Sequence, residues 1–513
     1  MISEDDPIVK KSADEASSLG KQQDSKKQIL KSTGIVGSAQ VVIILIRIVR
    51  TKAIALLLGP TGVGIFGMYV STLELVRGAT GLGLDFSAVR DVAEAHSAGD
   101  ERRMARTGTT MRRWMWITGL AGAALLAVFS RQFSSSGFGD RTHTADFVVL
   151  AIVPLLSAIS CGQVVLLRGA RRISDMARAN VFGAVVGLCT TVPLYWLWGV
   201  KGLVPAILVS AVADLGLSWL FARRLKIRSI KLSLRETIVG GMGMIRLGFF
   251  TVISGLAGSG ALYLVRTMIA DKAGLNSLGQ FQAAWNLSAT YVGMVLGAMG
   301  ADYYPRLVVV SHDNAQLRQL VNEQTEVALL LSGPLIVAML GFVDVAIQIF
   351  YTSKFGQCGD LLPWFLIGEV LKIVSWPMGF ALLAKNKGLL YVLAEVIWDV
   401  LFLVLVFVFM KKAGIESTGM AFVTTNVIYT VVIYMMCIHT CDFRCTARSI
   451  KSILFSVGLC GLAFLNLRFH HAHVWRIVSL ALLTTSVAYS YLELRKIVDL
   501  HQLVAKVSRK FGL

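Results

Sequence analysis

The stretch that decides the fold is RIVRTKAIALLLGPTGVGIFGMY, residues 47–69. It is apolar enough to form membrane helices, yet Arg47, Arg50 and Lys52 lie inside the hydrophobic run. A charge at that depth costs roughly 2.5–3.5 kcal/mol on insertion scales, so such side chains normally face a bundle interior or a water-filled cavity. Three cations in a cavity indicate an anionic cargo, whereas in the alternative reading Arg50 and Lys52 snorkel to the outer interface. The Gly59-Pro60 break predicts that two helices meet here, and the glycines after it permit close backbone approach.

Composition defines the class of protein. The chain has 513 residues, of which 55% are hydrophobic and 16% charged, against about 25% charged in soluble domains. Apolar runs of about 20 residues recur along its length, which is the pattern of a polytopic all-α membrane protein. Seven cysteines follow no disulfide framework. Residues 1–28 lack the apolar core of a cleavable signal and are predicted to form a disordered cytoplasmic tail.

The hydrophobic runs predict about fourteen transmembrane helices. They lie at about 31–57, 62–84, 109–130, 145–167, 178–198, 203–222, 240–270, 277–301, 325–350, 359–384, 389–410, 418–438, 450–467 and 474–492. With the N-terminus inside, 34 of the 50 Lys and Arg residues fall on the inner side, nine outside and seven within spans. This bias predicts that both termini are cytoplasmic. It also accounts for the net charge of +19 without nucleic acid as a partner.

The two halves of the chain repeat each other. The matching pairs are Arg50-Thr51 with Arg266-Thr267, Gly64-Ile65-Phe66 with Gly279-Gln280-Phe281, Gly83-Leu84-Asp85 with Gly300-Ala301-Asp302, and Gly199 with Gly414. Their offsets are 215 to 217 residues, and an even number of spans separates the copies. The pattern therefore predicts two six-helix bundles, residues 29–222 and 240–440, in a parallel repeat typical of alternating-access transporters. Residues 223–239 would be a cytoplasmic linker, and 441–513 would add two extra helices and a cytoplasmic tail.

Three segments carry a resemblance to a known superfamily. They are LGPTGVGIFGMY (58–69), LNSLGQFQAAWNLSATYVG (275–293) and MGADYYPRL (299–307). With them the chain, from residue 30 to about 490, resembles the multidrug/oligosaccharidyl-lipid/polysaccharide (MOP) exporter superfamily, and most closely the O-antigen and polysaccharide flippases of the Wzx type. The resemblance implies a two-bundle fold with a central cavity and a polyprenyl-diphosphate-linked oligosaccharide as cargo. It also implies location in the bacterial inner membrane and partnership with a polysaccharide polymerase and a chain-length regulator.

Charged residues within the spans are the candidates for cargo binding. They are Arg47, Arg50, Lys52, Glu74, Arg77, Arg266, Glu369 and Lys372. The Glu74–Arg77 and Glu369–Lys372 pairs stand three residues apart, so each pair shares a helix face and forms either a structural ion pair or part of the cavity wall.

A second set of charged residues is assigned to coupling or gating. The set is Asp85, Arg90, Asp302, Arg306, Glu395 and Asp399. Glu395 and Asp399 lie one turn apart, and two close acids raise one pKa, which suits reversible proton uptake. Alternatively, these two acids reach nearby lysines or interfacial water. Each repeated aspartate is followed by an arginine, so the sequence predicts either cross-bundle pairs that close a cytoplasmic gate or local helix-end structure.

Other motifs point to no cofactor and no enzyme chemistry. GVGIFG at 62–67 matches a dinucleotide fingerprint, but that motif needs a soluble strand–turn–helix unit, and here it lies between membrane helices. Cys437, Cys441 and Cys445 around His439 are read as buried thiols at a helix end, and the histidines at 470, 471 and 473 lie in an outer loop. No metal site is assigned.

The sequence thus predicts a flippase that moves a lipid-linked oligosaccharide from the cytoplasmic to the periplasmic leaflet. Two alternatives stay open: a drug/cation antiporter of the same fold, or a membrane glycosyltransferase or polymerase. The antiporter would need a dominant acidic cavity, and the second alternative a large outer loop with catalytic side chains.

Overall fold

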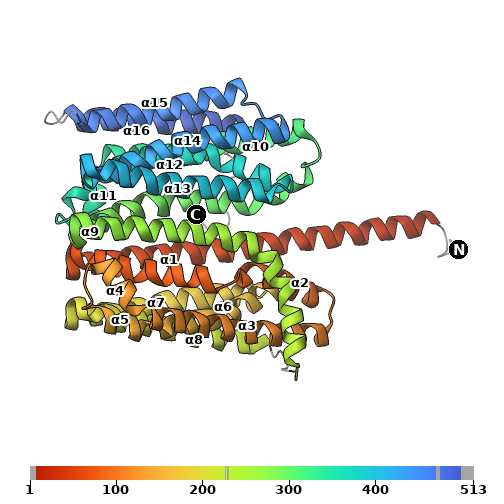
Figure 1. The fold of residues 1–513 in the computed structure, drawn as a ribbon. Coiled ribbons are helices and arrows are strands. Elements are labelled where there is room, and N and C mark those ends of the chain that lie inside the picture. Colours follow the sequence, from red (N-terminus) through yellow and green to blue (C-terminus); the bar gives the residue numbers. More distant parts are fainter. Residues whose placement is uncertain (1–6, 226, 228–229, 469–473, 498–513) are drawn as a thin grey trace. The chain divides into compact units, whose positions relative to one another are not determined.

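The structure is a computed structural model that describes residues 7–225, 227, 230–468 and 474–497 (Figure 1). Within these ranges the chain is built from helices, and contacts divide it into two compact units. Unit 1 contains residues 1–50, 80–127 and 149–248, and unit 2 contains residues 51–79, 128–148 and 249–513. The sequence repeat predicts continuous bundles instead. The two divisions differ because segments 51–79 and 128–148 of the first half pack with the second half.

Unit 1 is formed by five complete helices and the ends of two longer ones. The complete helices are α2 (Leu84–Ser97), α3 (Glu101–Val128), α6 (Ile152–Gly169), α7 (Ile173–Trp198) and α8 (Leu203–Ala222), with the short 3₁₀ turns η1 (Gly199–Gly202) and η2 (Arg223–Leu225). Two long helices, α1 (Pro7–Thr80) and α9 (Leu234–Val309), pass from unit 1 into unit 2. Helix α8 packs against α6 and α7, and α2 packs against α6.

Unit 2 holds the remaining helices. They are α4 (Ser130–Phe138), α5 (Thr144–Leu150), α10 (Asn314–Gly341), α11 (Val343–Phe350), α12 (Gly356–Ala384), α13 (Gly388–Ala413), α14 (Glu416–Cys441), α15 (Ala447–Arg468) and α16 (Val474–Ile497). Helix α14 packs between α12 and α13, whereas α15 and α16 pack on α10. An aromatic cluster lies among α9, α12, α13 and α14, where Trp285 contacts Phe365, Phe402 and Phe422 at centroid distances of 5.5–6.0 Å.

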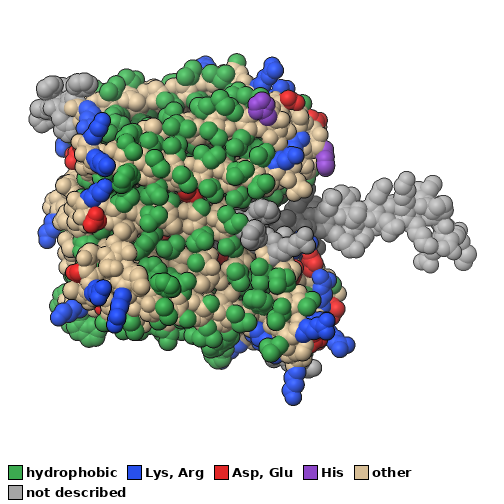
Figure 2. Space-filling model, in the orientation of Figure 1, with side chains coloured by type: hydrophobic (Ala, Val, Ile, Leu, Met, Phe, Trp, Pro, Cys, Tyr) green, Lys and Arg blue, Asp and Glu red, His purple; other side chains and the backbone are tan. Residues whose placement is uncertain are grey.

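The helices agree with the predicted spans in position. Among the described residues, nine helical stretches are long and apolar enough to cross a membrane, or ten if the bent pair α3–α4 counts as one. Of the nine, Ile173–Leu225 contains two predicted spans, 178–198 and 203–222, and Val252–Gly300 overlaps two, 240–270 and 277–301. The total of fourteen stays a prediction. On the face shown in Figure 2, hydrophobic side chains cover the flanks of the helices and Lys and Arg gather near their ends.

Helix α1 begins at Pro7, whereas composition predicts a disordered tail over residues 1–28. The helical part of this segment, residues 7–28, has no proline after Pro7 and contains five Lys and three Gln, both good helix formers. Helix propensity therefore outweighs low hydrophobicity here.

Gly59 breaks α1 where the sequence predicts a turn. Its φ of 65° and ψ of −170° lie in a region open essentially to glycine alone, and the helix resumes at Pro60, which needs no N–H partner at a first helical position. Gly274 breaks α9 in the same way, with φ 81° and ψ 168°. The two glycines stand 215 residues apart, as do Gly199 and Gly414, which also have positive φ.

A third pair at the same spacing, Arg171 and Asn386, ends α6 and α12 in the left-handed conformation. In each copy the left-handed residue donates its N–H to the carbonyl three residues earlier, and the next N–H bonds to the carbonyl five residues earlier, at 2.9–3.1 Å. This is the Schellman pattern that terminates helices. Backbone conformation thus preserves the repeat where side chains have diverged.

A close helix crossing within unit 2 explains why segment 51–79 belongs there. A Cβ added to Gly64 of α1 would lie 2.2 Å from the carbonyl oxygen of Leu275 in α9, and one added to Gly279 would lie 1.8 Å from the carbonyl oxygen of Pro60. The two backbones therefore touch, which only glycine permits.

Two polar contacts in unit 2 fix further segments. The buried Tyr69 of α1 donates its hydroxyl to the Asp146 carboxylate, and His143 Nδ1 lies 2.8 Å from both groups. At the start of α10, the Asp313 carboxylate accepts hydrogen bonds from the backbone N–H groups of Gln316 and Ala315. These bonds lower the pKa of Asp313 below its ordinary value, because they stabilise the ionised form.

Candidate functional site: a cationic cavity in unit 1

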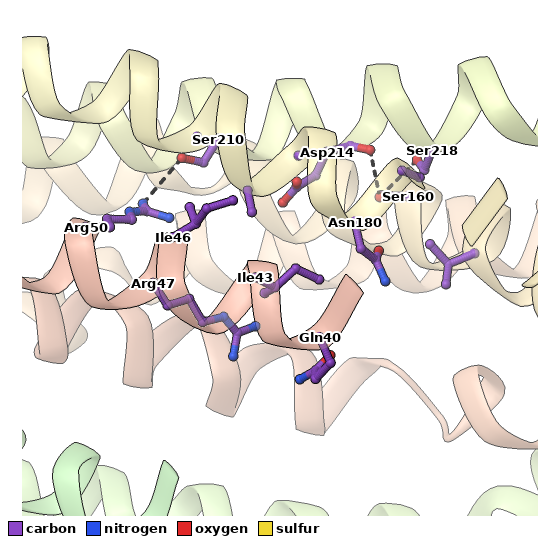
Figure 3. A pocket seen from close by; sticks show the side chains of 15 residues that line it. Gln40, Ile43, Ile46, Arg47, Arg50, Ser160, Asn180, Ser210, Asp214 and Ser218 are labelled. Carbon is purple, nitrogen blue, oxygen red and sulfur yellow. Dashed lines mark hydrogen bonds between the residues drawn. The ribbon is translucent and has the colours of Figure 1, made fainter. Parts of the chain in front are cut away.

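A cavity of about 390 Å³ opens among α1, α6, α7 and α8 of unit 1 (Figure 3). Its size lies in the range of small-molecule sites. It is lined by Gln40, Ile43, Ile46, Arg47, Arg50, Ser160, Val164, Ala179, Asn180, Gly183, Ala184, Gly187, Ser210, Asp214 and Ser218. Most of the polar members are neutral hydrogen-bonding groups, and three are charged.

Helical spacing places these residues on one face of each helix. Helix α8 contributes Ser210, Asp214 and Ser218, each four residues after the last, so they form a polar stripe along an otherwise apolar helix. Helix α7 contributes small residues at Gly183, Ala184 and Gly187, which leave room for the cavity. On the wall, Ser160 of α6 donates a hydrogen bond of 3.2 Å to the Asp214 carbonyl oxygen and lies 3.1 Å from the Ser218 hydroxyl.

Arg47 and Arg50 supply the positive charge of the cavity. Arg50 is half-buried and points toward α8, where its Nη2 lies 3.5 Å from the Ser210 hydroxyl (Figure 3). Its Nε is buried and makes no hydrogen bond within the described part of the chain. Arg47 lies one turn earlier and is exposed. The prediction that these two arginines face a cavity agrees with their place in its lining.

Asp214 is the acid of this cavity, and our sequence reasoning missed it. It interacts electrostatically with Arg50, and its carboxylate makes no ion pair within 4.0 Å among the described residues. Asp214 has no second acid at helical spacing and belongs to none of the repeated motifs. The available signal was a lone carboxylate midway along the apolar segment LVPAILVSAVADLGLSWLFA (203–222).

Lys52 does not line this cavity. Its ammonium group donates hydrogen bonds to the carbonyl oxygens of Gln348 and Tyr351, at the C-terminal end of α11 in unit 2. A cation at a helix C-terminus satisfies unpaired carbonyls and complements the helix dipole. The three cations predicted to act together therefore fall in two places.

The charged residues predicted around span two lie in unit 2. Glu74 and Arg77 are exposed on the last turns of α1, and Arg266 of α9 is 5% exposed. Arg266 interacts electrostatically with Glu74, while its Nε has no hydrogen-bond partner among the described residues. A buried guanidinium with a free donor retains the capacity to bind an acceptor group.

The second-half candidates meet among α12, α13 and α14. Lys372 Nζ lies 3.2 Å from the carboxylate of Glu369, which is 1% exposed, so the predicted pair is present. The Glu395 carboxylate accepts a hydrogen bond of 2.7 Å from the Tyr429 hydroxyl and interacts electrostatically with Asp399. The two acids thus lie close together, as their spacing predicts.

The gate candidates pair locally. Arg306 lies 3.4 Å from Asp302 on the same helix, and Arg90 lies 2.9 Å from Glu94. The hydrogen bond from Arg90 lowers the pKa of the Glu94 carboxylate below its ordinary value. Asp85 is exposed in the first turn of α2. The cross-bundle pairs, Asp302 with Arg90 and Asp85 with Arg306, stay predictions.

The cysteine and histidine clusters yield no metal centre among the described residues. Cys437 and Cys441 are buried on α14, and no group of three or more His, Cys, Asp or Glu side chains in the described ranges could hold a metal ion. The histidines at 470, 471 and 473 lie outside the described residues.

Comparison of the sequence with known protein families identifies the family of this chain. The sequence matches the polysaccharide biosynthesis protein family over residues 53–360, more than half of the chain. The chain belongs to this family. The chain is similar to the lipid III flippase of Escherichia coli strain K12, with 22% identity over 384 residues, 74% of this chain and 90% of that protein. It is also similar to the stage V sporulation protein B of Bacillus subtilis strain 168, with 26% identity over 199 residues, 37% of each chain.

Solved structures of other proteins share the fold of this chain. The lipid II flippase MurJ, in an inward closed conformation, matches with a TM-score of 0.70 at 12% identity, over 90% of this chain and 99% of that one. An inward-facing multidrug MATE transporter of the MOP superfamily matches with a TM-score of 0.60 at 16% identity, over 79% and 93%. The fold is therefore that of a MOP exporter, as the resemblance predicted. These relatives and solved structures include two flippases and a transporter.

Proposed function

We propose that this protein is a flippase that moves a lipid-linked oligosaccharide across the inner membrane by alternating access. The observation that carries the proposal is the unit 1 cavity, where Arg47 and Arg50 stand against a single acid among neutral hydrogen-bonding groups. The family and the flippases among the relatives support a lipid-linked cargo.

The cavity lining suits the polar part of such a cargo. A diphosphate cannot cross hydrocarbon as a bare anion, and arginine offers it both charge and paired donors. Serine and asparagine side chains both donate and accept, so they match the hydroxyl groups of sugars. In this proposal the glycan and diphosphate enter the cavity while the lipid tail stays in the bilayer.

The finer identity of the cargo follows from the resemblance. We assign a polyprenyl-diphosphate-linked repeat unit of O-antigen or a related surface polysaccharide, which a polymerase and a chain-length regulator would receive. Both termini lie in the cytoplasm in this assignment. Reporter fusions after residues 100, 230 and 500 should score cytoplasmic, and those near 140 and 412 periplasmic; an outward-facing 230 loop would refute this topology.

Unit 2 supplies the remaining roles in the proposal. Arg266, buried with a free donor, would bind a second anionic group of the cargo. Glu395 and Asp399 would take up and release the coupling ion, since they lie close together beside Tyr429. The cation-antiporter alternative gains no support from the unit 1 cavity, whose charged lining is two arginines and one aspartate.

Complementation of a deletion strain tests the function. Arg47→Ala and Arg50→Ala should abolish surface polysaccharide and cause the lipid-linked unit to accumulate, with normal protein levels on immunoblots. Each lost arginine removes hydrogen bonds to a charged group worth about 1.5–3 kcal/mol, or roughly 10- to 150-fold in affinity. Arg50→Lys should retain part of the activity, because the charge remains without the planar fork.

Lys52→Ala is the matched control. The sequence predicts that Lys52 lines the cavity with Arg47 and Arg50, but its ammonium donates hydrogen bonds to the end of α11. It should lower protein stability and leave export per molecule near that of the unchanged protein. Full export by both Arg47→Ala and Arg50→Ala would exclude the cavity from cargo binding.

A further inference from the structure

Asp214 occupies a place in the unit 1 cavity that α7 leaves open for it. A Cβ added to Gly183 would lie only 2.8 Å from Asp214 Oδ1, so a side chain at 183 would displace the carboxylate. The carboxylate has no ion pair among the described residues, although its own backbone carbonyl accepts a bond from Ser160. The Asp214 side chain is exposed and lines the cavity.

Arg50 is the cation that this carboxylate faces. The two side chains interact electrostatically, and the hydrogen bond from Arg50 to Ser210 is long, at 3.5 Å. The guanidinium Nε is buried without a partner in the described part of the chain. Arg50 thus has donor capacity that the protein leaves unused, and Asp214 is the acid in the cavity lining that interacts with it electrostatically.

We propose that Asp214 is an internal counter-ion of Arg50 that the anionic group of the cargo replaces, and that Asp214 takes up one proton as the cargo binds. This inference rests on the proposed function, because it concerns the same cavity. Asp214 is exposed, and two anions that approach the same cation repel each other, so the Asp214 carboxyl, the weaker acid of the two, takes up the proton. The proton comes from water when the diphosphate enters and returns to water when it leaves, and no covalent bond changes.

Few other groups complicate the titration. Helix α1 presents Arg47 and Arg50 to the cavity, and both stay charged at all relevant pH values. Helix α6 presents Ser160, α7 presents Asn180, and the other polar residues of α8 are serines, none of which titrates in this range. Within the cavity lining, Asp214 is therefore the group to which a proton taken up on binding is assigned, and the Asp214→Asn variant separates it from the acids of unit 2.

The test is calorimetric titration of the full-length protein in detergent with a short-chain prenyl diphosphate sugar. Both phosphates of this probe are diesters and stay ionised between about pH 5 and 8, so the probe itself binds no proton. We expect the dissociation constant to fall with decreasing pH, by at most about tenfold per pH unit for one linked proton. Repeating the titration in buffers of different ionisation enthalpy counts the protons, and we expect about one per probe bound.

Two variants separate the counter-ion from a structural role. Asp214→Asn should bind the probe as tightly at neutral pH as the unchanged protein does at low pH, with no proton uptake. Gly183→Ala keeps the acid but displaces it, and should reduce the proton count as well, so the test survives if Asp214→Asn fails to fold. The control Asp271→Asn removes an exposed acid of α9 outside the cavity and should leave the pH dependence unchanged.

The outcomes distinguish the two levels of the proposal. The counter-ion role is refuted if the unchanged protein binds the probe tightly without proton uptake, or if Asp214→Asn has the same pH dependence as the unchanged protein. Either result leaves the proposed flippase function unaffected. If the unchanged protein binds no probe at any pH, or binds it equally well after Arg50→Ala, the cargo site is wrong and the counter-ion falls with it.

Discussion

The backbone contact between Gly64 and α9 leads to a quantitative prediction for Gly64→Ala. The new Cβ would stand 2.2 Å from the Leu275 carbonyl oxygen and 3.0 Å from the Gly279 nitrogen. An ordinary contact between carbon and a carbonyl oxygen is about 3.3 Å, so the two helices must separate locally by about 1 Å. Since backbone atoms block the new methyl group, no side-chain rotation relieves the clash.

Overpacking of this kind typically costs about 1–3 kcal/mol, occasionally more, and a rigid backbone obstacle places Gly64→Ala at or above the upper end. Replacing a helical glycine by alanine returns up to about 1 kcal/mol of helix propensity. We therefore expect a net loss of about 2–3 kcal/mol, or a fall of about 2–3 °C in Tm at about 1 °C per kcal/mol for a chain of this size. Thermal unfolding of the detergent-purified protein measures it.

Gly260→Ala is the control on the same pair of helices. Its Cβ would lie 3.8 Å from the Leu75 side chain, an ordinary contact, so its Tm should stay the same or rise slightly. If Gly64→Ala and Gly260→Ala unfold within about 1 °C of each other, the backbone crossing in unit 2 is not as close as described.

Three further perturbations test other contacts of unit 2. Tyr69→Phe removes the hydroxyl that donates to Asp146 and should cost about 1.5–3 kcal/mol, read as a lower Tm; an unchanged Tm would mean that water replaces the bond. Lys372→Met leaves the buried Glu369 unpaired and should lower the free energy of unfolding by about 1–3 kcal/mol, read as a lower Tm. The expected loss is smaller than for a fully buried pair because Lys372 is partly exposed, and adding Glu369→Gln should recover most of it. Asp313 has a lowered pKa, so its contribution to stability is fully present above the unfolded pKa and is lost as pH falls through the folded one. The protection factors of the amide hydrogens at the start of α10, which are corrected for the intrinsic exchange rate, should therefore fall in acid, and those of Asp313→Asn should not show this pH dependence.

Local chemistry made much of the fold predictable from sequence. The Gly59-Pro60 break, its counterpart at Gly274 and the apolar spans all depend on residues next to each other in the chain. The division into two units was not predictable, because it depends on the contact between Gly64 and Gly279, and a glycine does not reveal which backbone it will touch.

The candidate site was predictable only in part for the same reason. Charge in an apolar run correctly placed Arg47 and Arg50 beside a cavity. The same argument included Lys52, whose partners Gln348 and Tyr351 lie almost 300 residues away in the chain. The sequence around Lys52 therefore does not indicate that it binds there. Asp214 could have been found, since an isolated acid in a membrane span is itself a signal.

The paired turns after α6 and α12 carry a consequence for how the chain enters the membrane. A left-handed conformation costs a non-glycine residue roughly 1–2 kcal/mol, and asparagine tolerates it better than arginine does. The second copy has Asn386 at this position, whereas the first keeps Arg171. Arg171 lies at an inner-facing turn in the proposed topology, where each additional arginine helps to retain a loop in the cytoplasm during insertion. At this turn the first half has the residue that favours cytoplasmic retention, Arg171, and the second half has the residue that lowers backbone strain, Asn386.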